Sequence, residues 1–390
     1  MAVLDPRHAK PLFEKPDTSP EASGCGNAAP AISISRRVSQ KIWVGNVAVG
    51  GDAPISVQSM LTNDTCDVAE TVYQLKRLAE AGCDIIRLAV PNKDAAEALK
   101  QIVPQSPVPI VADIHFDYRL ALMAADNGVH ALRVNPGNLS SKEFIRAVAR
   151  KAKERHLPIR IGVNAGSLEK IVKEKFPEDR VRQLVESALL NVRLLEDEAF
   201  DQIKISVKAS DPLEMIAAYR QLAPLVPYPL HLGVTEAGTL KRGLVKSAFA
   251  IGTLLLQGIG DTIRVSLTAD SIEEVFAGHE ILRSVGLRHK GPNLISCPSC
   301  GRCEVDLHGL ANAVEGMIAN METPLNVAVM GCFVNGPGEA GHADVGIAGG
   351  KGQYYIFRGE ERVKKVAEAD ALREFEAELL AVEAEKKAGR

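Results

Sequence analysis

The sequence predicts an α/β protein in which a (β/α)8 TIM-type barrel is followed by a small α+β domain. Eight short runs rich in β-branched residues alternate with amphipathic segments between about residues 40 and 286. A cluster of cysteines then opens a segment of different composition. Regular alternation of strand and helix patterns is typical of a parallel sheet covered by helices, and eight such units suit a closed barrel.

The predicted strands are short runs in which apolar residues dominate, at 55–60, 85–90, 109–116, 131–136, 159–166, 203–210, 230–238 and 262–269. Apolar residues at helical spacing predict helices at 68–83, 142–156, 181–197, 212–226, 241–258 and 271–286. A doubly wound open sheet remains an alternative, because periodicity indicates the units and not their closure. No GxGxxG motif follows the first strand, which weakens that alternative.

Composition predicts where the chain divides. Residues 1–34 are rich in Pro, Ala, Ser and Gly and have no apolar core of the signal-peptide kind, so we expect a disordered leader. Residues 35–288 are the predicted barrel, and 289–390 are the predicted second domain. Its expected elements are a helix, a strand, a strand pair and a charged C-terminal helix, at 304–321, 325–331, 354–366 and 369–390.

Bulk composition excludes several classes of protein. Hydrophobic residues make up 46% of the 390 residues and aromatics only 4%, so aliphatic side chains must build the core. A net charge of −3 argues against a general nucleic-acid binder, which needs a basic surface. No run of 18 apolar residues occurs, so we expect no transmembrane helix and a cytoplasmic protein.

The strongest chemical signal is the segment CPSCGRC at 297–303, with Cys332 beyond one predicted helix and one predicted strand. Clustered thiolates bind metals, and this spacing favours an iron–sulfur cluster over structural zinc, which would need a second CxxC pair. Spacing leaves the fourth ligand open. Cys303 would supply sulfur, whereas Glu339 would supply an oxygen that exchanges more easily and suits a catalytic cluster.

Basic residues recur inside the predicted strands, at Arg87, Arg133, Arg160, Lys204, Lys208 and Arg264. A charged side chain in a packed strand is costly unless it is paired or binds a ligand. Six of them indicate a compact substrate with more than one phosphate, since guanidinium groups suit phosphate oxygens. The alternative is internal pairing with Asp and Glu inside the barrel.

Further candidates lie where predicted strands end, which is the active end of such barrels. They are Asn135, Asn164, Lys208, Glu236 and Ser266. Glu236 is a candidate general acid or base, or else a partner of a neighbouring arginine. His231, Asp113 and His115 are either functional or hydrogen-bonded core residues.

Together these residues form motifs that resemble the family of bacterial 4-hydroxy-3-methylbut-2-enyl diphosphate synthases of the methylerythritol phosphate route to isoprenoids. The motifs, in order between about residues 35 and 365, are VQSM, ADIHFD, LRVNPGN, IRIGVNAGSLE, SVKASD, LHLGVTEAG, GIGDTIRVSL, CPSCGR and GCFVNGPGE. The resemblance implies a barrel followed by an iron–sulfur domain similar to part of sulfite and nitrite reductases.

The resemblance also implies a [4Fe–4S] cluster held by Cys297, Cys300, Cys332 and Glu339. The family pattern has no cysteine at position 303, so the spacing argument and the resemblance disagree there, and we follow the resemblance. A zinc-stabilised barrel without redox chemistry and a non-catalytic electron-transfer protein are the rival interpretations.

The implied reaction is a two-electron reductive ring opening and dehydration of 2-C-methyl-D-erythritol 2,4-cyclodiphosphate to (E)-4-hydroxy-3-methylbut-2-enyl diphosphate. The implied electron donor is reduced flavodoxin or ferredoxin, and the implied assembly is a homodimer in which one cluster domain caps the partner's barrel. Glu236 is the expected proton donor. The expected substrate contacts are Arg87, Arg133, Asn135, Arg160, Lys208, His231, Arg264, Ser266 and Asn335.

Overall fold

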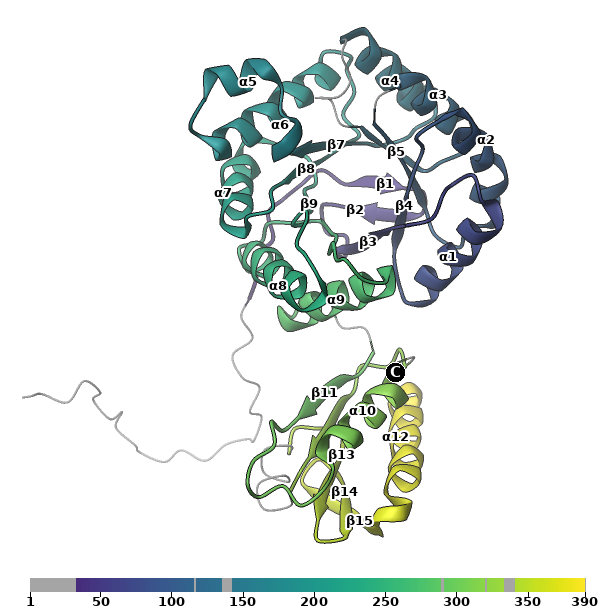
Figure 1. Ribbon diagram of the computed structural model, residues 1–390, viewed down its shortest axis with the longest axis vertical. Coiled ribbons are helices and arrows are strands. Elements are labelled where there is room, and N and C mark those ends of the chain that lie inside the picture. Colours follow the sequence, from purple (N-terminus) through teal and green to yellow (C-terminus); the bar gives the residue numbers. More distant parts are fainter. Residues whose placement is uncertain are drawn as a thin grey trace, which may run out of the picture. The chain divides into compact units, whose positions relative to one another are not determined.

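A computed structural model describes residues 33–115, 117–134, 142–288, 291–319, 321–332 and 341–389. Eight parallel strands form one sheet in the order β8-β7-β6-β5-β4-β3-β10-β9. A parallel bridge between Ile205 and Leu230 joins β8 to the segment before β9 and closes the ring. The predicted barrel is therefore confirmed over the open sheet (Figure 1).

The barrel strands all lie within the predicted runs. They are β3 (Ser56–Met60), β4 (Ile85–Ala89), β5 (Ile110–Ile114), β6 (Ala131–Val134), β7 (Ile159–Asn164), β8 (Ile203–Lys208), β9 (His231–Leu232) and β10 (Thr262–Ile263). The last two contain only two residues each, so the segments that follow them belong to loops. Glu236 consequently lies in the loop after β9 and not at the end of a strand.

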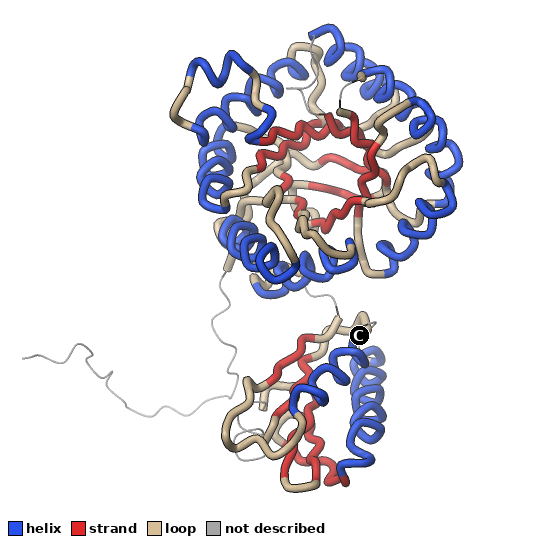
Figure 2. The backbone as a smooth tube through the Cα atoms, viewed as in Figure 1, coloured by secondary structure: helices blue, strands red, loops and turns tan. Residues whose placement is uncertain are grey.

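Helices surround the strand ring, as the blue and red tubes of Figure 2 show. They are α1 (Val68–Glu80), α2 (Lys93–Ile102), α3 (Tyr118–Asp126), α4 (Lys142–Glu154), α5 (Lys170–Lys175), α6 (Arg180–Glu196), α7 (Pro212–Leu222), α8 (Leu240–Leu256) and α9 (Ser271–Ser284). The six predicted helices are confirmed; α2, α3 and α5 are additional. Aspartate side chains accept backbone N–H bonds at the start of α1, α3, α6, α7 and α9, which explains where these helices begin.

The barrel strands present two different faces. Outward-facing aliphatic residues such as Ile86, Leu132 and Ile205 pack beneath the helices in one continuous core. Residues of the opposite parity point into the ring and include Arg87, Arg133 and many other polar residues. The barrel therefore has an apolar exterior layer and a polar interior.

A hairpin that the sequence analysis missed precedes the barrel. Its strands, β1 (Ile42–Val44) and β2 (Val47–Val49), pair antiparallel around a turn at Gly45. Its apolar residues pack against Ile85, Val111 and Ala131 near the starts of β4, β5 and β6, so the hairpin closes the amino-terminal end of the barrel. The alternation in IWVGNVAV is the signal that predicts it.

The C-terminal domain is a five-stranded mixed sheet with its own core. In chain order its elements are β11 (Asn293–Ser296), α10 (Leu307–Ile318), β12 (Asn326–Met330), β13 (Val345–Gly350), β14 (Gln353–Arg358), β15 (Glu361–Ala367) and α12 (Ala371–Ala388). Strands β11, β12 and β13 are parallel, whereas β14 and β15 are antiparallel to their neighbours. Apolar residues of α10 and α12 share one core with this sheet.

Two strands of this domain are absent from the prediction. The segment VGIAGG of β13 has the composition of a loop, yet a Cβ at Gly346 would lie 2.3 Å from the ring of Phe357. Packing against an aromatic ring therefore requires a glycine in this strand. Most of the predicted leader, residues 1–32, lies outside the described residues, and the division after residue 288 stays a prediction. Among the described helices, none is long and apolar enough to cross a membrane.

Candidate functional site in the barrel and the cysteine segment

The predicted basic strand residues gather inside the barrel. Arg133, Arg160 and Lys204 occupy matching positions on β6, β7 and β8, and each is buried. Arg87 on β4 and Lys208 at the end of β8 are buried as well, and the Arg264 side chain is only 16% exposed. The structure therefore brings all six cations of the sequence prediction into one interior.

Asp113 on β5 is the main counter-charge of this interior. Its carboxylate lies 2.8 Å from Nη1 of Arg133, 3.5 Å from Nε of Arg87 and 3.3 Å from Nε2 of His115. Burial alone would raise the pKa of Asp113, but Arg87, the His115 hydrogen bond and Arg133 outweigh it and hold that pKa far below its ordinary value. Asp113 is therefore ionised and aligns two arginines.

Glu274 of α9 plays a similar part on the other side of the ring. Its carboxylate accepts hydrogen bonds from Oγ of Ser59 and from the backbone N–H of Leu267, and lies 3.7 Å from Nη2 of Arg264. It thus holds Arg264 together with the backbone directly after Ser266.

Internal pairing accounts for only part of the charge. Arg160 donates Nη1 to Oγ of Ser206, but its Nε and Nη2 are enclosed without a partner among the described residues. Lys204 Nζ is enclosed in the same way, and no carboxylate of the described residues pairs with Lys208. The alternative of complete Asp and Glu pairing is therefore wrong for the interior that the structure describes.

The uncompensated charge has electrostatic consequences. Burial, followed by repulsion from neighbouring arginines, lowers the pKa of Lys208 and Arg160 well below their ordinary values. Burial lowers the pKa of Arg87 to about 9, although Asp113 opposes this effect. A bound polyanion would relieve these costs, because it supplies the charge that the protein does not.

Two glycines keep space beside these cations. A Cβ at Gly162 on β7 would lie 2.7 Å from Nε of Arg133, and one at Gly233 would lie 3.2 Å from Nζ of Lys208. A side chain at Gly162 would displace Arg133, and one at Gly233 would clash with the backbone oxygen of Arg264, 2.6 Å away, and crowd Lys208. These two glycines, Asp113 and Glu274 complete the site; the sequence indicates Asp113 as functional or structural, but it gives no signal for Gly162, Gly233 or Glu274.

The other residues predicted for the barrel site differ from the basic strand residues, and from one another, in burial and backbone conformation. His231 is fully buried with both ring nitrogens unpartnered among the described residues, and burial followed by the nearby cations lowers its pKa well below the ordinary value. Ser266 is half-buried after β10. Glu236 is exposed and has φ 53, a left-handed conformation that is unusual for glutamate. Asn135 lies outside the described residues.

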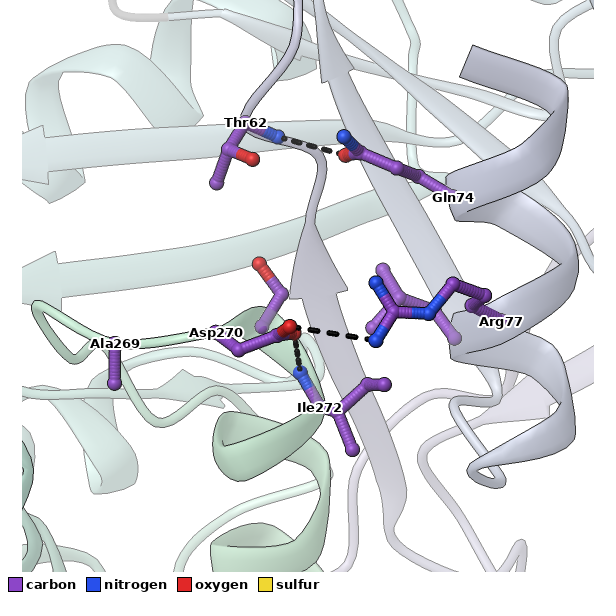
Figure 3. A pocket seen from close by; sticks show the side chains of 8 residues that line it. Thr62, Gln74, Arg77, Ala269, Asp270 and Ile272 are labelled. Atoms are coloured by element: carbon purple, nitrogen blue, oxygen red, sulfur yellow. Dashed lines mark hydrogen bonds and ion pairs between the residues drawn. The ribbon is translucent and has the colours of Figure 1, made fainter. Parts of the chain in front are cut away.

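A cavity of about 130 Å³ lies at the carboxyl-terminal rim of the barrel between α1 and α9. Figure 3 shows its charged groups already paired: Asp270 accepts the backbone N–H of Ile272 at the start of α9 and lies 3.4 Å from Arg77. The backbone N–H of Thr62 points to the amide oxygen of Gln74. Since these groups satisfy one another, the cavity does not extend the anion site.

The cysteine segment follows β11. The N–H of Gly331 at the end of β12 donates to Sγ of Cys297 at 3.2 Å, and a Cβ at this glycine would lie 2.7 Å from Sγ of Cys303. Ser299, inside the CPSC turn, has φ 66. The backbone N–H aimed at the sulfur of Cys297 suits a thiolate that holds a metal cluster.

The full ligand set is not visible in the described residues. Among them, no three candidate ligands converge closely enough to hold a metal ion. Cys300 is exposed and Cys332 is half-buried. Glu339 and Asn335 lie outside the described residues. The assignment of Cys297, Cys300, Cys332 and Glu339 as ligands therefore stays a prediction.

Comparison with known proteins adds independent information. Residues 39–279 match the model of the GcpE TIM-barrel domain, and residues 293–381 match that of the GcpE protein C-terminal domain. This chain belongs to the GcpE family. The two matches together cover both folded parts, which agrees with the barrel and the mixed sheet described above.

Curated members of the GcpE family are closely similar to this chain. A 4-hydroxy-3-methylbut-2-en-1-yl diphosphate synthase (flavodoxin) of Desulfotalea psychrophila is 56% identical over 90% of this chain and 98% of that protein. The synthase of the same name from Geobacter sulfurreducens is 55% identical over 89% of this chain and 98% of that protein. The expected activity, that of an oxidoreductase in isoprenoid precursor synthesis, is thereby confirmed.

Solved structures are more distant. A dihydropteroate synthase of Yersinia pestis covers 63% of this chain and is itself covered to 98%, with 12% identity and a TM-score of 0.46.

We expect Asp113→Asn to destabilise the protein by about 3–5 kcal/mol, because it leaves Arg87 and Arg133 without their counter-charge. Sulfate should restore more stability to this variant than to the wild type, since an anion would replace the lost carboxylate. Urea unfolding followed by circular dichroism, with and without sulfate, measures both effects. Asp126→Asn, which weakens two ion pairs at the surface, with Lys151 and Arg155, is the control and should cost about 1 kcal/mol or less. Equal losses in the two variants would contradict the role of Asp113.

Proposed function

We propose that the basic interior of the barrel binds the diphosphate of 2-C-methyl-D-erythritol 2,4-cyclodiphosphate while its ring is reductively opened. The reaction takes up two electrons and two protons, breaks the ring C–O bond and a C–OH bond, forms a C=C bond and releases water. The observation that carries the proposal is the excess of enclosed cations, of which Arg160, Lys204 and Lys208 have no carboxylate partner among the described residues. A cyclic diphosphate supplies two negative charges in a compact group.

The residues proposed to contact the diphosphate are called the clamp, and they lie on several strands around the ring. Arg87 and Arg133, aligned by Asp113, present donors from one side, and Arg160 and Lys208 from the neighbouring strands. Arg264 and Ser266, held through Glu274, complete the ring. Asn135 and His231 are proposed further contacts, and Asn335 is a proposed contact from the cysteine segment.

We assign Glu236 as the proton donor to the departing hydroxyl. Its left-handed backbone conformation supports this role, because a strained residue outside glycine persists where function requires it. Its exposure leaves the carboxyl group free to approach a substrate that is bound in the barrel mouth.

The proposed cofactor is a [4Fe–4S] cluster held by Cys297, Cys300, Cys332 and Glu339. When bound, such a cluster supplies single electrons at low potential. The Gly331 N–H that points to Cys297 would stabilise a thiolate there, and the absence of a side chain at Gly331 leaves space next to Cys303. We propose that Cys303 is not a ligand of the working cluster.

The proposed electron donor is reduced flavodoxin in preference to ferredoxin, because the names of the similar synthases specify flavodoxin. Free thiols at Cys66, Cys83 and Cys297 suit a reducing compartment, so we place the reaction in the cytoplasm.

We also propose a homodimer, in which the cluster domain of one chain caps the barrel of the other. An exposed apolar stripe on the barrel supports self-association: Val245, Phe249 and Leu256 of α8 are 69%, 51% and 49% exposed, and Phe276 of the neighbouring α9 is 53% exposed. Single exposed apolar residues are ordinary, but three at helical spacing on one face of α8, with a fourth on the adjacent α9, are typical of an interface.

Anaerobic purification tests the cofactor. We expect a brown protein with about four irons and four sulfides per chain, which Cys300→Ser should lose and Cys303→Ser should keep. The measurement is chemical iron and sulfide analysis together with the absorption spectrum. Loss of iron in Cys303→Ser would make that cysteine the fourth ligand. A colourless protein with one zinc would favour the non-redox alternative.

Replacement of Glu236 by glutamine tests the proton donor. We expect kcat to fall at least ~100-fold, since general acid catalysis contributes about that much, while the Kd of the cyclic diphosphate stays within a few-fold. Steady-state turnover with reduced flavodoxin and equilibrium binding without it separate the two effects. Glu178→Gln, at an exposed position, is the control. Full turnover by Glu236→Gln would exclude the acid role.

The substitution Phe249→Glu tests the apolar stripe as the dimer interface. A charge in the centre of a self-complementary apolar surface should convert the dimer to a monomer, which light scattering after size exclusion detects. Ile171→Glu changes an apolar residue of α5 that is even more exposed, at 67% against 51% for Phe249, and should leave the mass unchanged. A dimer that persists in Phe249→Glu would place the interface elsewhere.

A further inference from the structure

Lys204 is a cation that the proposed clamp does not use. It lies on β8 four residues before Lys208, so its side chain points to the same interior from a deeper level. Its side chain is buried, and Nζ is fully enclosed with no hydrogen-bond partner among the described residues.

The surroundings of Lys204 explain why it has no counter-ion. Arg160 is its register partner on β7, and His231 on β9 is a second buried basic group. The nearby acid is Asp261, before β10, but its oxygens are already engaged. One accepts from Arg36 and Ser39, and the other accepts the backbone N–H of Leu230 and lies 3.7 Å from Arg37.

An ammonium group in such a place is costly, since it is buried beside another cation without a partner. Burial, followed by repulsion from Arg160, lowers the pKa of Lys204 to about 7, although Asp261 opposes the shift. In the free protein near neutral pH, a large part of Lys204 is therefore the uncharged amine. The guanidinium of Arg160 has a much higher ordinary pKa and stays charged although burial lowers that pKa.

The charge state of Lys204 changes once an anion binds nearer the carboxyl-terminal end of the barrel. We propose that Lys204 takes up a proton when the cyclic diphosphate binds, so that substrate binding and protonation of this buried amine are coupled. The inference rests on the proposed function, because it requires a polyanion within the field of Arg160. The ligand neutralises that guanidinium, so the repulsion that adds to the effect of burial on Lys204 disappears, and the pKa of Lys204 rises.

The proton must come from solvent. Each phosphorus of a cyclic diphosphate carries one strongly acidic oxygen, which is ionised throughout the neutral range, so the ligand neither gives nor takes a proton. The step is therefore addition of one proton to Nζ without any change of oxidation state.

Lys204 is a better acceptor than the other buried bases. His231 faces Arg160, Lys208, Lys204 and Arg87, and Lys208 faces four arginines, so several cations oppose a further charge on each. Lys204 faces one cation, Arg160, and one acid, Asp261. Neutralisation of that one neighbour leaves burial as the cause that lowers the pKa of Lys204, with Asp261 opposing it.

Proton uptake by Lys204 makes the affinity for the cyclic diphosphate fall, and not rise, with increasing pH. Below pH about 7 the amine is already protonated before binding, so this group adds no pH dependence. Above that pH the free protein lacks the proton that the complex holds, so the affinity should fall by up to ~10-fold per pH unit until the complex loses it too.

Titration calorimetry on the anaerobic holoenzyme, with no electron donor, tests the inference. The cyclic diphosphate is titrated at pH 8 into wild type, Lys204→Met and the exposed control Lys76→Met, in buffers with different ionisation enthalpies. The dependence of the heat on buffer counts the protons. We expect uptake in Lys204→Met to be lower by nearly one proton per chain, and its affinity to fall less steeply above pH 7. The Lys76→Met variant should match wild type.

Equal uptake in wild type and Lys204→Met would overturn the inference, because the proton would then reside on Lys208 or His231. A wild type without uptake and with a flat pH profile would overturn it even if Lys204→Met fails to fold. Sulfate, which is fully ionised in this range, separates the two proposals. If the cyclic diphosphate does not bind but sulfate binds with Lys204-dependent uptake, the proposed substrate is wrong and the coupling holds.

Discussion

The structure depends on an excess of positive charge that is enclosed in a barrel with an aliphatic exterior. Arg160, Lys204 and Lys208 are buried without carboxylate partners among the described residues, while Asp113 serves both Arg87 and Arg133. Alternation along each parallel strand makes this possible, since one set of side chains packs under the helices and the other fills the ring. The aliphatic layer supplies the stability that the charged interior does not.

Closure of the ring at its amino-terminal end is the second requirement. The β1–β2 hairpin covers that end with Ile42, Val44 and Val49, and Asp261 is engaged there by Arg36 and Ser39. An anion can therefore reach the cations only from the carboxyl-terminal end, where the loops after β9 and β10 carry Glu236 and Ser266. Charge and access together direct a diphosphate to one place.

The sequence alone predicts the barrel and its six interior cations well, because strand periodicity and the cost of buried charge are local properties. It does not predict which carboxylates pair with them. Asp113 and Glu274 act across the ring from β5 and from α9, and such contacts follow only from closure. Strand β13 does not follow from the sequence, because Gly346 makes room for Phe357 and Gly349 for Val305, a tertiary effect that overrides propensity. The cluster ligands depend on spacing, and Glu339 lies outside the described residues.

Buried charge without a partner lowers the stability of the free protein, but it allows the site to bind a diphosphate. Neutralising the interior with more carboxylates would remove the cost of burying Arg160 and Lys208, but it would also remove the attraction for a diphosphate. The free protein therefore bears an unfavourable charge that its ligand relieves, so binding and stability are linked. An uncharged amine at Lys204 lowers that cost while the site is empty, because lysine can release a proton where arginine cannot. The arginines of the interior therefore stay charged whether or not an anion is bound, whereas Lys204 becomes charged when an anion binds.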